Sequence, residues 1–379
     1  MGLANNINLT KTSKSMKILV FSWKDIKHPY AGGSEVNIHE QAKRWVKNGH
    51  NIIQFSPLFK GAKKNETIDG IEIIRKGGRF SVYLWAPLYY LLYLRKRNEI
   101  IIDIENGIPF FTTIFSRKPK LAIIHHVHGS VFFKELPFFI AWIPYILERY
   151  GIRIFYKNTK FIAVSETTKK EMIEVLKIKP ENIEIVYNGL EHSKLKSKAK
   201  KTKEPSIIYF GRLMKYKRID LLMEIFSKVL KEAPDTKLHI AGTGIVEQEL
   251  KEKAKKMKLE NNIIFHGYVN DNQKKYLLKS SWIFVNPSSM EGWGVTVIEA
   301  NAVGTPALAF NVPGLKEAIR HNETGYLAKD EKEMIRNIIL LIKNEKLRKK
   351  LGENAKKWSK KFSWDATADK TLKLIKQIK

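Results

Sequence analysis

Short runs of apolar residues alternate with longer segments of helical periodicity along the whole chain. In the first half these runs are MKILVFSW, HNIIQFSP, IEIIRK, IIDIEN, LAIIHH, KFIAVS and IEIVYN, and in the second half they are SIIYFGR, KLHIAG, IIFHGY, WIFVNP and PALAF. Runs without polar alternation predict strands that are buried on both faces, as in parallel sheets covered by helices. The pattern therefore predicts an α/β protein.

The two sets of runs are separated by a lysine-rich segment, EHSKLKSKAKKTKEP, at residues 191–205. It has no apolar periodicity, which is typical of a linker. A length of 379 residues also favours two domains. We therefore predict two doubly wound, Rossmann-like domains, residues 1–189 and 190–355, facing a central cleft at the carboxyl ends of their strands. The segment 356–379 is expected to be helical and to pack back towards the first domain.

Composition narrows the function classes. The chain contains 0 cysteines, which excludes disulfides, thiolate zinc sites and a cysteine nucleophile. Its formal net charge of +30 favours an anionic partner such as nucleic acid, anionic lipid or a phosphorylated small molecule. The alternative is a lysine-rich surface set by genome composition or by a hot habitat. The residues before Met16 are polar, and we expect a loose tail there, no signal peptide and a cytoplasmic protein.

Two aromatic-rich stretches stand outside the alternating pattern. We expect the first, FSVYLWAPLYYLLYLRKR at residues 80–97, to form a core helix. The second, VFFKELPFFIAWIPYILERY at residues 131–150, contains two prolines and clustered aromatic side chains. It is a candidate for lying on a membrane surface, and the alternative is that its aromatic side chains fill the core of the first domain.

Three loops at strand ends carry candidate binding residues. Gly32 and Gly33 follow the first strand and open a helix, where backbone amides suit a phosphate or an oxyanion. Arg212 follows the first strand of the second half directly, and Lys217 lies close behind it. A guanidinium and an ammonium in one loop suit a diphosphate, although both could be ordinary surface cations.

The third loop, at residues 291–294, is Glu-Gly-Trp-Gly, and Glu299 follows eight positions after Glu291. The amides of Gly292, Trp293 and Gly294 lie at a helix N-terminus. Glu299 stands on an apolar stretch, VTVIEANAV, with no cation near it in the sequence, and it can accept hydrogen bonds from a ribose diol. With the cations of the preceding loop, these groups predict a site for a sugar nucleotide.

This set of motifs resembles the family 4 retaining glycosyltransferases of the GT-B fold. The resemblance rests on the E-x7-E spacing, the GR-L-x-x-x-K arrangement, the AGGSE loop and the VSETTKKEM and VYNGL segments, and it runs from about Met16 to the last helix. It implies transfer of a hexose from a UDP or GDP type sugar donor without a metal or other cofactor. The usual Lys-Gly is here Lys217-Arg218.

The resemblance also implies roles for particular residues. Glu299 would bind the donor ribose, and Glu291 with the amides of the 292–294 turn would hold the donor sugar. Arg212 and Lys217 would hold the diphosphate and stabilise it as it leaves. One histidine at the end of a first-domain strand would lie in the active site; the pattern favours His125, with His126 nearly as good and His128 a further candidate.

Three histidines in HHVH also allow a zinc site. Successive residues of a strand point to opposite faces, so His125 and His126 converge only if the strand has ended, and we expect no metal. Upstream, Asp103 and Glu105 are spaced like the metal-binding Asp-x-Asp of other glycosyltransferases. We expect them instead to end a strand on the acceptor side, with Glu105, Asn106 and His128 near the cleft.

The expected mechanism follows from charge. Departure of a nucleoside diphosphate builds negative charge that the cations and loop amides stabilise. No carboxylate is evidently placed as a covalent nucleophile, so we expect same-face attack by the acceptor hydroxyl, with the leaving phosphate taking the proton. We expect a glycan or lipid-linked acceptor and a protein bound to the cytoplasmic membrane face. The alternatives are a nucleotide-sugar epimerase of the same fold and a basic nucleic-acid-binding protein.

Overall fold

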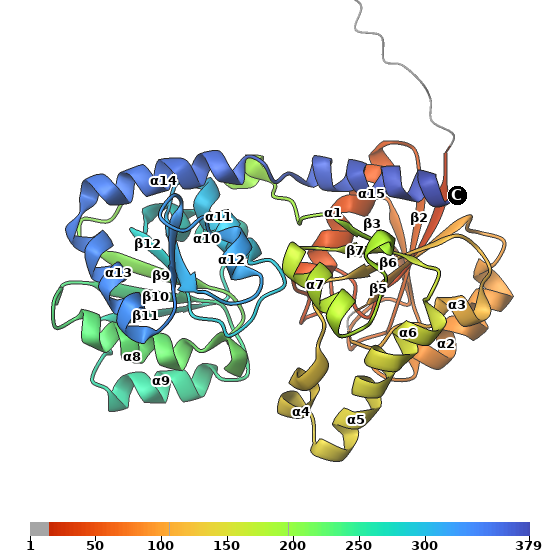
Figure 1. Ribbon diagram of the computed structural model, residues 1–379, viewed down its shortest axis with the longest axis horizontal. Coiled ribbons are helices and arrows are strands. Elements are labelled where there is room, and N and C mark those ends of the chain that lie inside the picture. The colour runs from red at the N-terminus through yellow and green to blue at the C-terminus, as the bar shows by residue number, and fades with distance from the viewer. Residues whose placement is uncertain (1–14, 106, 196) are drawn as a thin grey trace, which may run out of the picture.

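The computed structural model describes residues 15–105, 107–195 and 197–379 of the chain. Two α/β domains lie side by side, and α14 (Glu345–Ser359) and α15 (Trp364–Ile378) run along one side of both (Figure 1). The prediction of two doubly wound α/β domains is therefore confirmed. The tail expected before Met16 falls mostly on residues 1–14, which lie outside the described residues.

The sheet of the first domain has eight strands within the described residues, in the order β3-β4-β2-β1-β5-β6-β7-β8. Neighbouring strands are parallel except for the β3–β4 pair. The strands are β1 (Lys17–Phe21), β2 (Asn51–Ser56), β3 (Asn65–Ile68), β4 (Ile71–Arg75), β5 (Ile100–Glu105), β6 (Lys120–Ile124), β7 (Lys160–Ala163) and β8 (Ile183–Ile185).

The sheet of the second domain is parallel throughout, with the order β11-β10-β9-β12-β13-β14 in the described part of the chain. Its strands are β9 (Ser206–Phe210), β10 (Lys237–Ala241), β11 (Ile263–Gly267), β12 (Ile283–Asn286), β13 (Ala307–Phe310) and β14 (Gly325–Ala328). Each apolar run found in the sequence overlaps one strand of the two sheets. The sequence reading missed β3 and β14, which are short and lie at the sheet edges.

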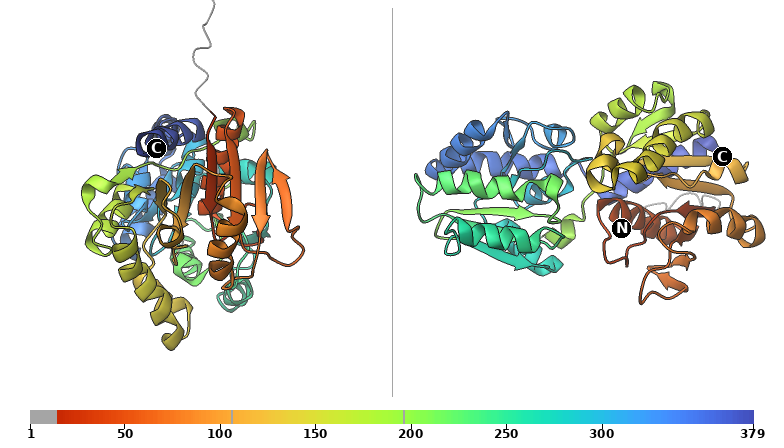
Figure 2. Two further views of the ribbon diagram at one scale, coloured as in Figure 1. Left: turned by 90° about the vertical axis from the view of Figure 1, so that its right-hand side faces the viewer. Right: turned by 90° about the horizontal axis from the view of Figure 1, so that it is seen from below.

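Helices cover both faces of each sheet (Figures 1 and 2). In the first domain these are α1 (Gly33–Lys47), α2 (Val82–Tyr89), α3 (Thr112–Phe115), α4 (Phe132–Glu135), α5 (Phe138–Ile146), α6 (Ile152–Phe155) and α7 (Glu166–Glu174). In the second they are α8 (Ile219–Val229), α9 (Glu247–Lys256), α10 (Asp271–Ser280), α11 (Val295–Ala302), α12 (Leu315–Ala318) and α13 (Glu331–Lys343). Short 3-10 or π segments are η1 (Tyr90–Leu94), η2 (Gly129–Val131), η3 (Leu147–Gly151), η4 (Pro180–Asn182), η5 (His192–Leu195) and η6 (Lys215–Lys217).

The last helix belongs to the core of the first domain. Ala368, Leu372 and Ile375 of α15 are buried in the same apolar cluster as Ile38 and Trp45 of α1. The Trp45 indole also donates a hydrogen bond to the Ala368 carbonyl oxygen at 3.0 Å. The chain therefore enters the second domain near residue 191 and returns to the first domain after α14.

The stretch at residues 80–97 is not the core helix that its composition predicts. Val82, Ala86, Tyr90 and Leu94 are buried, but the other face of α2 and η1 is open to solvent. Leu84 on that face is 77% exposed. The stretch is helical, but a helix that lies on one face of a sheet buries only one of its own sides.

The stretch at residues 131–150 is also largely outside the core. It forms α4, α5 and η3, which extend away from the rest of the first domain (Figure 1). Phe139 is 86% exposed, and Ile140 and Ile143 are exposed beside it. Phe133 packs with Trp142 and Tyr145 inside this projection. The alternative that these aromatics fill the core of the first domain is therefore wrong for most of them.

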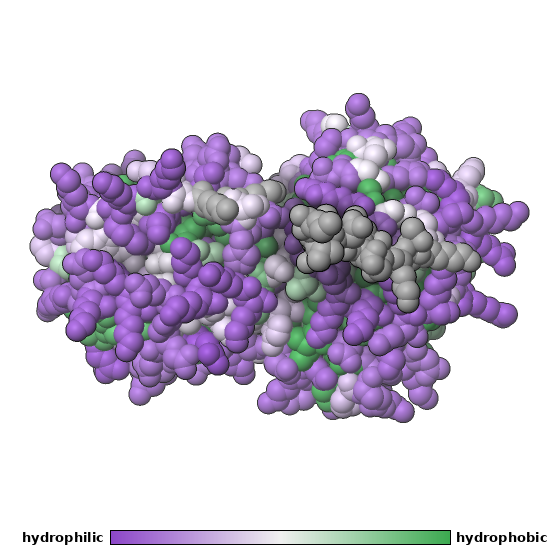
Figure 3. Space-filling view, turned by 90° about the horizontal axis from the view of Figure 1, so that it is seen from above, coloured by the Kyte–Doolittle hydropathy of each residue, from purple (hydrophilic) through white to green (hydrophobic). Residues whose placement is uncertain are grey.

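Apolar side chains are unevenly distributed over the surface. The face over α14 and α15 is mostly hydrophilic (Figure 3), whereas the exposed apolar residues of α5 lie on the projection at the other side of the first domain. Within the described residues, no helix combines the length and the apolar character needed to cross a bilayer.

Candidate active site

The second domain contributes an ion pair at the carboxyl end of its sheet. Lys217 ends η6 in the loop after β9, and its Nζ contacts Oε1 of Glu291 in the loop after β12. The same oxygen accepts hydrogen bonds from Ser288 Oγ at 3.0 Å and Asn286 Nδ2 at 3.2 Å. Burial opposes ionisation of Glu291, but Lys217 and the two hydrogen bonds nevertheless hold the pKa of Glu291 below its usual value. The two residues thus form one charged unit.

The 291–294 turn touches the first domain. A Cβ at Gly292 would lie 2.4 Å from the carbonyl oxygen of His125, so a glycine is required for this approach. Gly294 adopts a positive φ of 75° immediately before α11. The Trp293 side chain does not face the cleft: it is buried and packs on Tyr187, with ring centroids 4.4 Å apart. Only the backbone of Trp293 remains as a ligand-binding group.

Glu299, on α11, is not an isolated carboxylate. Its Oε1 lies 2.9 Å from Nζ of Lys274 on α10, and Lys274 also lies 3.6 Å from Asp271. Burial alone would lower the pKa of Lys274, but Glu299 and Asp271 raise it above its ordinary value. No cation lies near Glu299 in the sequence, but α10 brings Lys274 to it in the folded protein. A ribose bound at Glu299 would share this carboxylate with Lys274.

Arg212 connects the two domains at the glycine loop. Its guanidinium carbon would lie 3.8 Å from a Cβ at Gly32, so any side chain at that position would meet Arg212. The amide of Gly32 is not available for a phosphate, however, because Glu35 Oε2 accepts from it at 2.6 Å as a helix cap. A Cβ at Gly33 would have no other atom within 4 Å. Of the predicted amides in this loop, that of Gly32 is therefore excluded.

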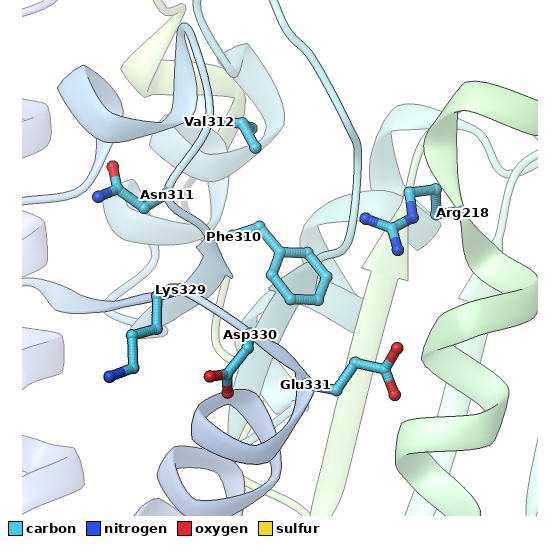
Figure 4. Close-up of a pocket in the computed structure, with 7 residues that line it drawn as sticks. All are labelled: Arg218, Phe310, Asn311, Val312, Lys329, Asp330 and Glu331. Atoms are coloured by element: carbon cyan, nitrogen blue, oxygen red, sulfur yellow. The ribbon is translucent and has the colours of Figure 1, made fainter.

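The residue after Lys217 departs from the family pattern, in which glycine is usual. Arg218 has a φ of 53°, in the left-handed region that favours glycine, which is the usual residue of the pattern. Its guanidinium lies 5.3 Å from the ring centroid of Phe310. Both residues line a hollow between the ends of β13 and β14 and the start of α8, with Asn311, Val312, Lys329, Asp330 and Glu331 (Figure 4). Its mixed charges do not resemble a phosphate site.

The three histidines occupy different environments after β6. Burial lowers the pKa of His125 to about 4, and its Nε2 has no hydrogen-bond partner within the described residues. Burial, followed by the charges of His128, His125, Lys217 and Arg212, lowers the pKa of His126 well below its usual value. His126 is therefore neutral near pH 7 and lies within electrostatic reach of Lys217 and Arg212.

His128 is held by residues of the first domain. Its amide donates to Glu148 Oε1 at 2.8 Å, and its ring stacks on Phe132 with centroids 5.0 Å apart. The His126 and His128 rings lie 4.0 Å apart. Among the described residues, no group of three or more His, Asp or Glu side chains is arranged as metal ligands.

The acidic end of β5 lies beside His128. A Cβ at Gly107 would lie 3.6 Å from the His128 ring, which places the loop after Glu105 against it. Glu105 is buried, and burial with the charges of Asp103 and Glu148 raises its pKa well above the usual value. Asp103 Oδ2 accepts a hydrogen bond from Thr112 at 2.9 Å, inside the core. Asn106, predicted for the acceptor side, lies outside the described residues.

A contact across the cleft was not foreseen from the sequence. The carboxylate of Glu317, at α12 in the second domain, accepts from the amides of Glu166 at 2.8 Å and Thr167 at 2.6 Å. These amides form the N-terminus of α7 in the first domain, where a negative charge is favourable. Together with the contact between Gly292 and His125, this capping holds the two domains against each other.

Two family models match consecutive parts of the chain. Residues 31–194 match Glycosyltransferase Family 4, and residues 191–358 match Glycosyl transferases group 1. An uncharacterized glycosyltransferase of Haemophilus influenzae is 32% identical over 59% of this chain and 65% of its own length. A second, from Methanocaldococcus jannaschii, is 29% identical, and the match spans 60% of its length. A third, also from M. jannaschii, is 27% identical over 96% of this chain and 99% of its own.

Solved structures share the fold over nearly the whole chain. Sucrose-phosphate synthase of Thermosynechococcus elongatus aligns with a TM-score of 0.78 at 18% identity, covering 95% of this chain and 98% of that one. HepE of Anabaena, solved with UDP and glucose, aligns with a TM-score of 0.75 at 17% identity, covering 96% and 100%. At these identities the likeness establishes the architecture of two facing Rossmann-like domains.

Proposed function

The chain belongs to the family 4 glycosyltransferases of the GT-B fold, and on this basis we propose that it transfers a hexose from a nucleoside diphosphate sugar to an acceptor hydroxyl. The observation that carries the proposal is the cation pair at the cleft: Lys217, paired with Glu291, and Arg212, which faces the Gly32 loop. These cations come from a loop at the carboxyl end of a parallel strand, where ligands of open α/β sheets bind.

The proposed donor is of the UDP or GDP type. Its diphosphate lies between Arg212 and Lys217, its sugar lies against Glu291 and the amides of the 292–294 turn, and its ribose hydroxyls lie at Glu299. Glu291 orients the Lys217 ammonium as well as the sugar, because the two side chains are already in contact. Structural relatives solved with UDP support a nucleotide in this fold.

The proposed reaction retains the anomeric configuration and needs no metal. As the bond between the anomeric carbon and the phosphate oxygen breaks, Arg212 and Lys217 stabilise the negative charge on the leaving diphosphate. The acceptor hydroxyl attacks from the same face, and its proton passes to the leaving phosphate oxygen. The neutral state of His125 and His126 supports this arrangement, because it adds no positive charge against the sugar as the ring becomes cationic.

The proposed acceptor is lipid-linked or presented at a membrane. The support is the exposed apolar surface of α5, which includes Phe138, Phe139 and Ile143, and that of α2 and η1. The second of these ends in three exposed cations at residues 95–97. Apolar side chains beside cations suit an anionic lipid surface, at about 1 kcal/mol for each cation near it. On this proposal the protein is a peripheral membrane protein on the cytoplasmic face.

The reaction is tested by incubating the protein with a panel of UDP and GDP sugars and measuring nucleoside diphosphate release. We expect release with one donor, stimulated by the correct acceptor. An epimerase would convert the nucleotide sugar without releasing the diphosphate, and a nucleic-acid-binding protein would instead retard DNA or RNA in a gel at moderate salt. Absence of release with every donor would count against the proposal.

Membrane binding is tested by flotation with vesicles of phosphatidylcholine, with and without phosphatidylglycerol. We expect the wild type to float with the anionic vesicles at low salt, and Phe138→Ser with Phe139→Ser to reduce flotation. The control is Tyr268→Ser, which alters an exposed aromatic residue of the second domain. If the wild type stays in the soluble fraction, or the double variant floats equally well, the membrane proposal is wrong.

A further inference from the structure

Trp23 brings two cations of the first domain together. It follows β1, and its indole Nε1 donates to the carbonyl oxygen of Arg79, in the loop after β4, at 3.1 Å. Nζ of Lys24 lies 4.8 Å from the centroid of the Trp23 ring, and the guanidinium carbon of Arg79 lies 5.7 Å from it. Cations at these distances are attracted to the indole, so one ring holds both.

These cations lie on the cleft side of the first domain. Nζ of Lys24 donates to the Tyr30 carbonyl oxygen at 3.2 Å, two residues before Gly32. Arg212 of the second domain approaches the same loop at Gly32. Lys24 and Arg212 therefore both contact one short segment, Lys24 from the first domain and Arg212 from the second.

Positive charge is in excess around the Gly32 loop. In the part of the chain that the structure describes, neither Lys24, Arg79 nor Arg212 forms an ion pair with a carboxylate. The carboxylate of Glu35 accepts instead from the Gly32 amide at 2.6 Å and from Ser34 Oγ at 2.8 Å. The neighbouring cations do have partners: Arg75 is paired with Asp25 and Glu66, and Lys217 with Glu291.

The Lys24 ammonium carries a cost that an anion would remove. Burial lowers its pKa, the Glu35 carboxylate opposes this in part, and Arg212 and Arg79 lower the pKa further. A partly buried cation between two others is unfavourable unless a negative group joins it. Among the described residues, Glu35 is the carboxylate that acts on Lys24, and it faces three cations, so the loops after β1 and β4 keep an excess of positive charge that an anion would balance.

We propose that Lys24 and Arg79, held on Trp23, bind a phosphate group of the acceptor. This inference rests on the proposed glycosyl transfer and adds the chemical class of the acceptor, a phosphate ester with a free hydroxyl. The donor diphosphate is bound by Lys217 and Arg212 from the second domain, so the two phosphate sites meet at Gly32 from opposite domains. The ammonium and the guanidinium together provide a point charge and a planar fork for the phosphate oxygens.

The first experiment uses inorganic phosphate as the probe, titrated calorimetrically into protein saturated with UDP or GDP. We expect the wild type to bind phosphate, and Lys24→Gln and Arg79→Gln each to weaken it about tenfold or more, as for loss of one charged hydrogen bond. Nucleotide affinity should stay within about twofold. The control is Arg117→Gln, an exposed cation of the first domain that precedes β6 and so lies at the opposite end of the sheet.

Two results would overturn the inference. One is phosphate binding that is absent in the wild type or unchanged in both variants. The other is an equal loss of nucleotide affinity in both variants, which would assign Lys24 and Arg79 to the donor site. If no nucleotide binds at all, the proposed function fails, but titration of the nucleotide-free protein still tests the phosphate site through the same variants.

A second experiment distinguishes a free phosphate ester from a lipid headgroup. Its arms are sn-glycerol 3-phosphate, titrated in place of inorganic phosphate, and flotation with vesicles of equimolar phosphatidylglycerol and phosphatidylcholine. If Lys24→Gln weakens binding of glycerol 3-phosphate but leaves flotation unchanged, the acceptor is a soluble ester. If it also reduces flotation relative to Arg117→Gln, the site takes a lipid phosphate. If neither changes, the inference is wrong.

Discussion

Replacing Gly292 with alanine should disable the enzyme without unfolding it. The added Cβ would lie 2.4 Å from the carbonyl oxygen of His125, in the other domain. Carbon and oxygen atoms in contact normally stay about 3.3–3.6 Å apart, so the cleft has to widen by about 1 Å at this point. The φ of Gly292 is outside the positive region, so alanine causes no strain within its own loop.

A displacement of about 1 Å between reacting groups can reduce turnover about a hundredfold, or about 2.7 kcal/mol. We therefore expect kcat of Gly292→Ala to fall by about this factor. The temperature of half-unfolding should shift by no more than about 3 °C, because each domain keeps its own core. The assay is nucleoside diphosphate release under saturating donor, with the unfolding transition followed by circular dichroism.

The matched control is Gly33→Ala, which adds the same methyl group to a cleft loop of the first domain and keeps the backbone amide, the group for which Gly33 is a binding candidate. Nothing lies within 4 Å of that methyl group, so we expect turnover close to that of the wild type. If kcat of Gly292→Ala stays within about threefold of the wild type, less than 1 kcal/mol, the contact between Gly292 and His125 is not part of the reacting state. Equal loss in both variants would also refute the reasoning.

Four further predictions concern Lys217, Glu299, His125 and the need for a metal ion. Lys217→Ala should reduce kcat by roughly tenfold to a thousandfold, the range for one charge-stabilising group, and Lys217→Arg should rescue it only in part, as steady-state kinetics will show. Glu299→Ala should weaken UDP or GDP binding in calorimetry far more than it lowers the unfolding temperature, and unchanged affinity would remove Glu299 from the site. The pKa of His125 is lowered to about 4 in the folded state, so the unfolded chain binds more protons between about pH 4 and 6.5. The stability of the folded state should therefore fall as the pH drops through that window. In urea titrations, His125→Gln should flatten this dependence of stability on pH. Activity should survive EDTA, and a loss that a divalent ion restores would contradict metal independence.

The fold could be predicted because its cause is local. Strands covered on both faces need apolar residues at nearly every position, and runs such as ILVF and ALAF supply them in the sequence itself. Two of the edge strands, β3 and β14, could not be predicted in this way. β3 reads NETI and β14 reads GYLA, and both depend on pairing with a neighbouring strand for their conformation.

The candidate site could be predicted only as a set of loops. Arg212 and Glu291 were found because each follows a buried strand, and parallel strands bring their carboxyl ends to one edge. The ion pairs between them were not found, since sheet order sets which loops meet. Lys217 and Glu291 are 74 positions apart, and Lys274 reaches Glu299 from the preceding helix. Nothing in the spacing of Lys24, Arg79 or Glu317 marks them either.

The exposed helices show a different limit. A hydrophobic stretch tells how much apolar surface a segment carries, but not which element covers it. Leu84 and Phe139 are large apolar residues of the kind found in protein cores. They are nevertheless exposed, because no helix of the described chain lies over them. The same residues would be buried by a lipid surface, so composition alone cannot separate the two cases.

The two passages of the chain between the domains run against each other. A Cβ at Gly189 would lie 2.3 Å from the amide nitrogen of Trp364, and Arg44 of α1 binds Glu191 on the outgoing passage and Asp365 on the returning one. Two adjacent connections place the covalent link between the domains at one point, so a relative rotation of the domains would pivot there. This point lies on the α14–α15 side (Figure 1), so such a rotation would open the cleft most on the opposite side, where α4 and α5 project and where the proposed membrane acceptor would enter.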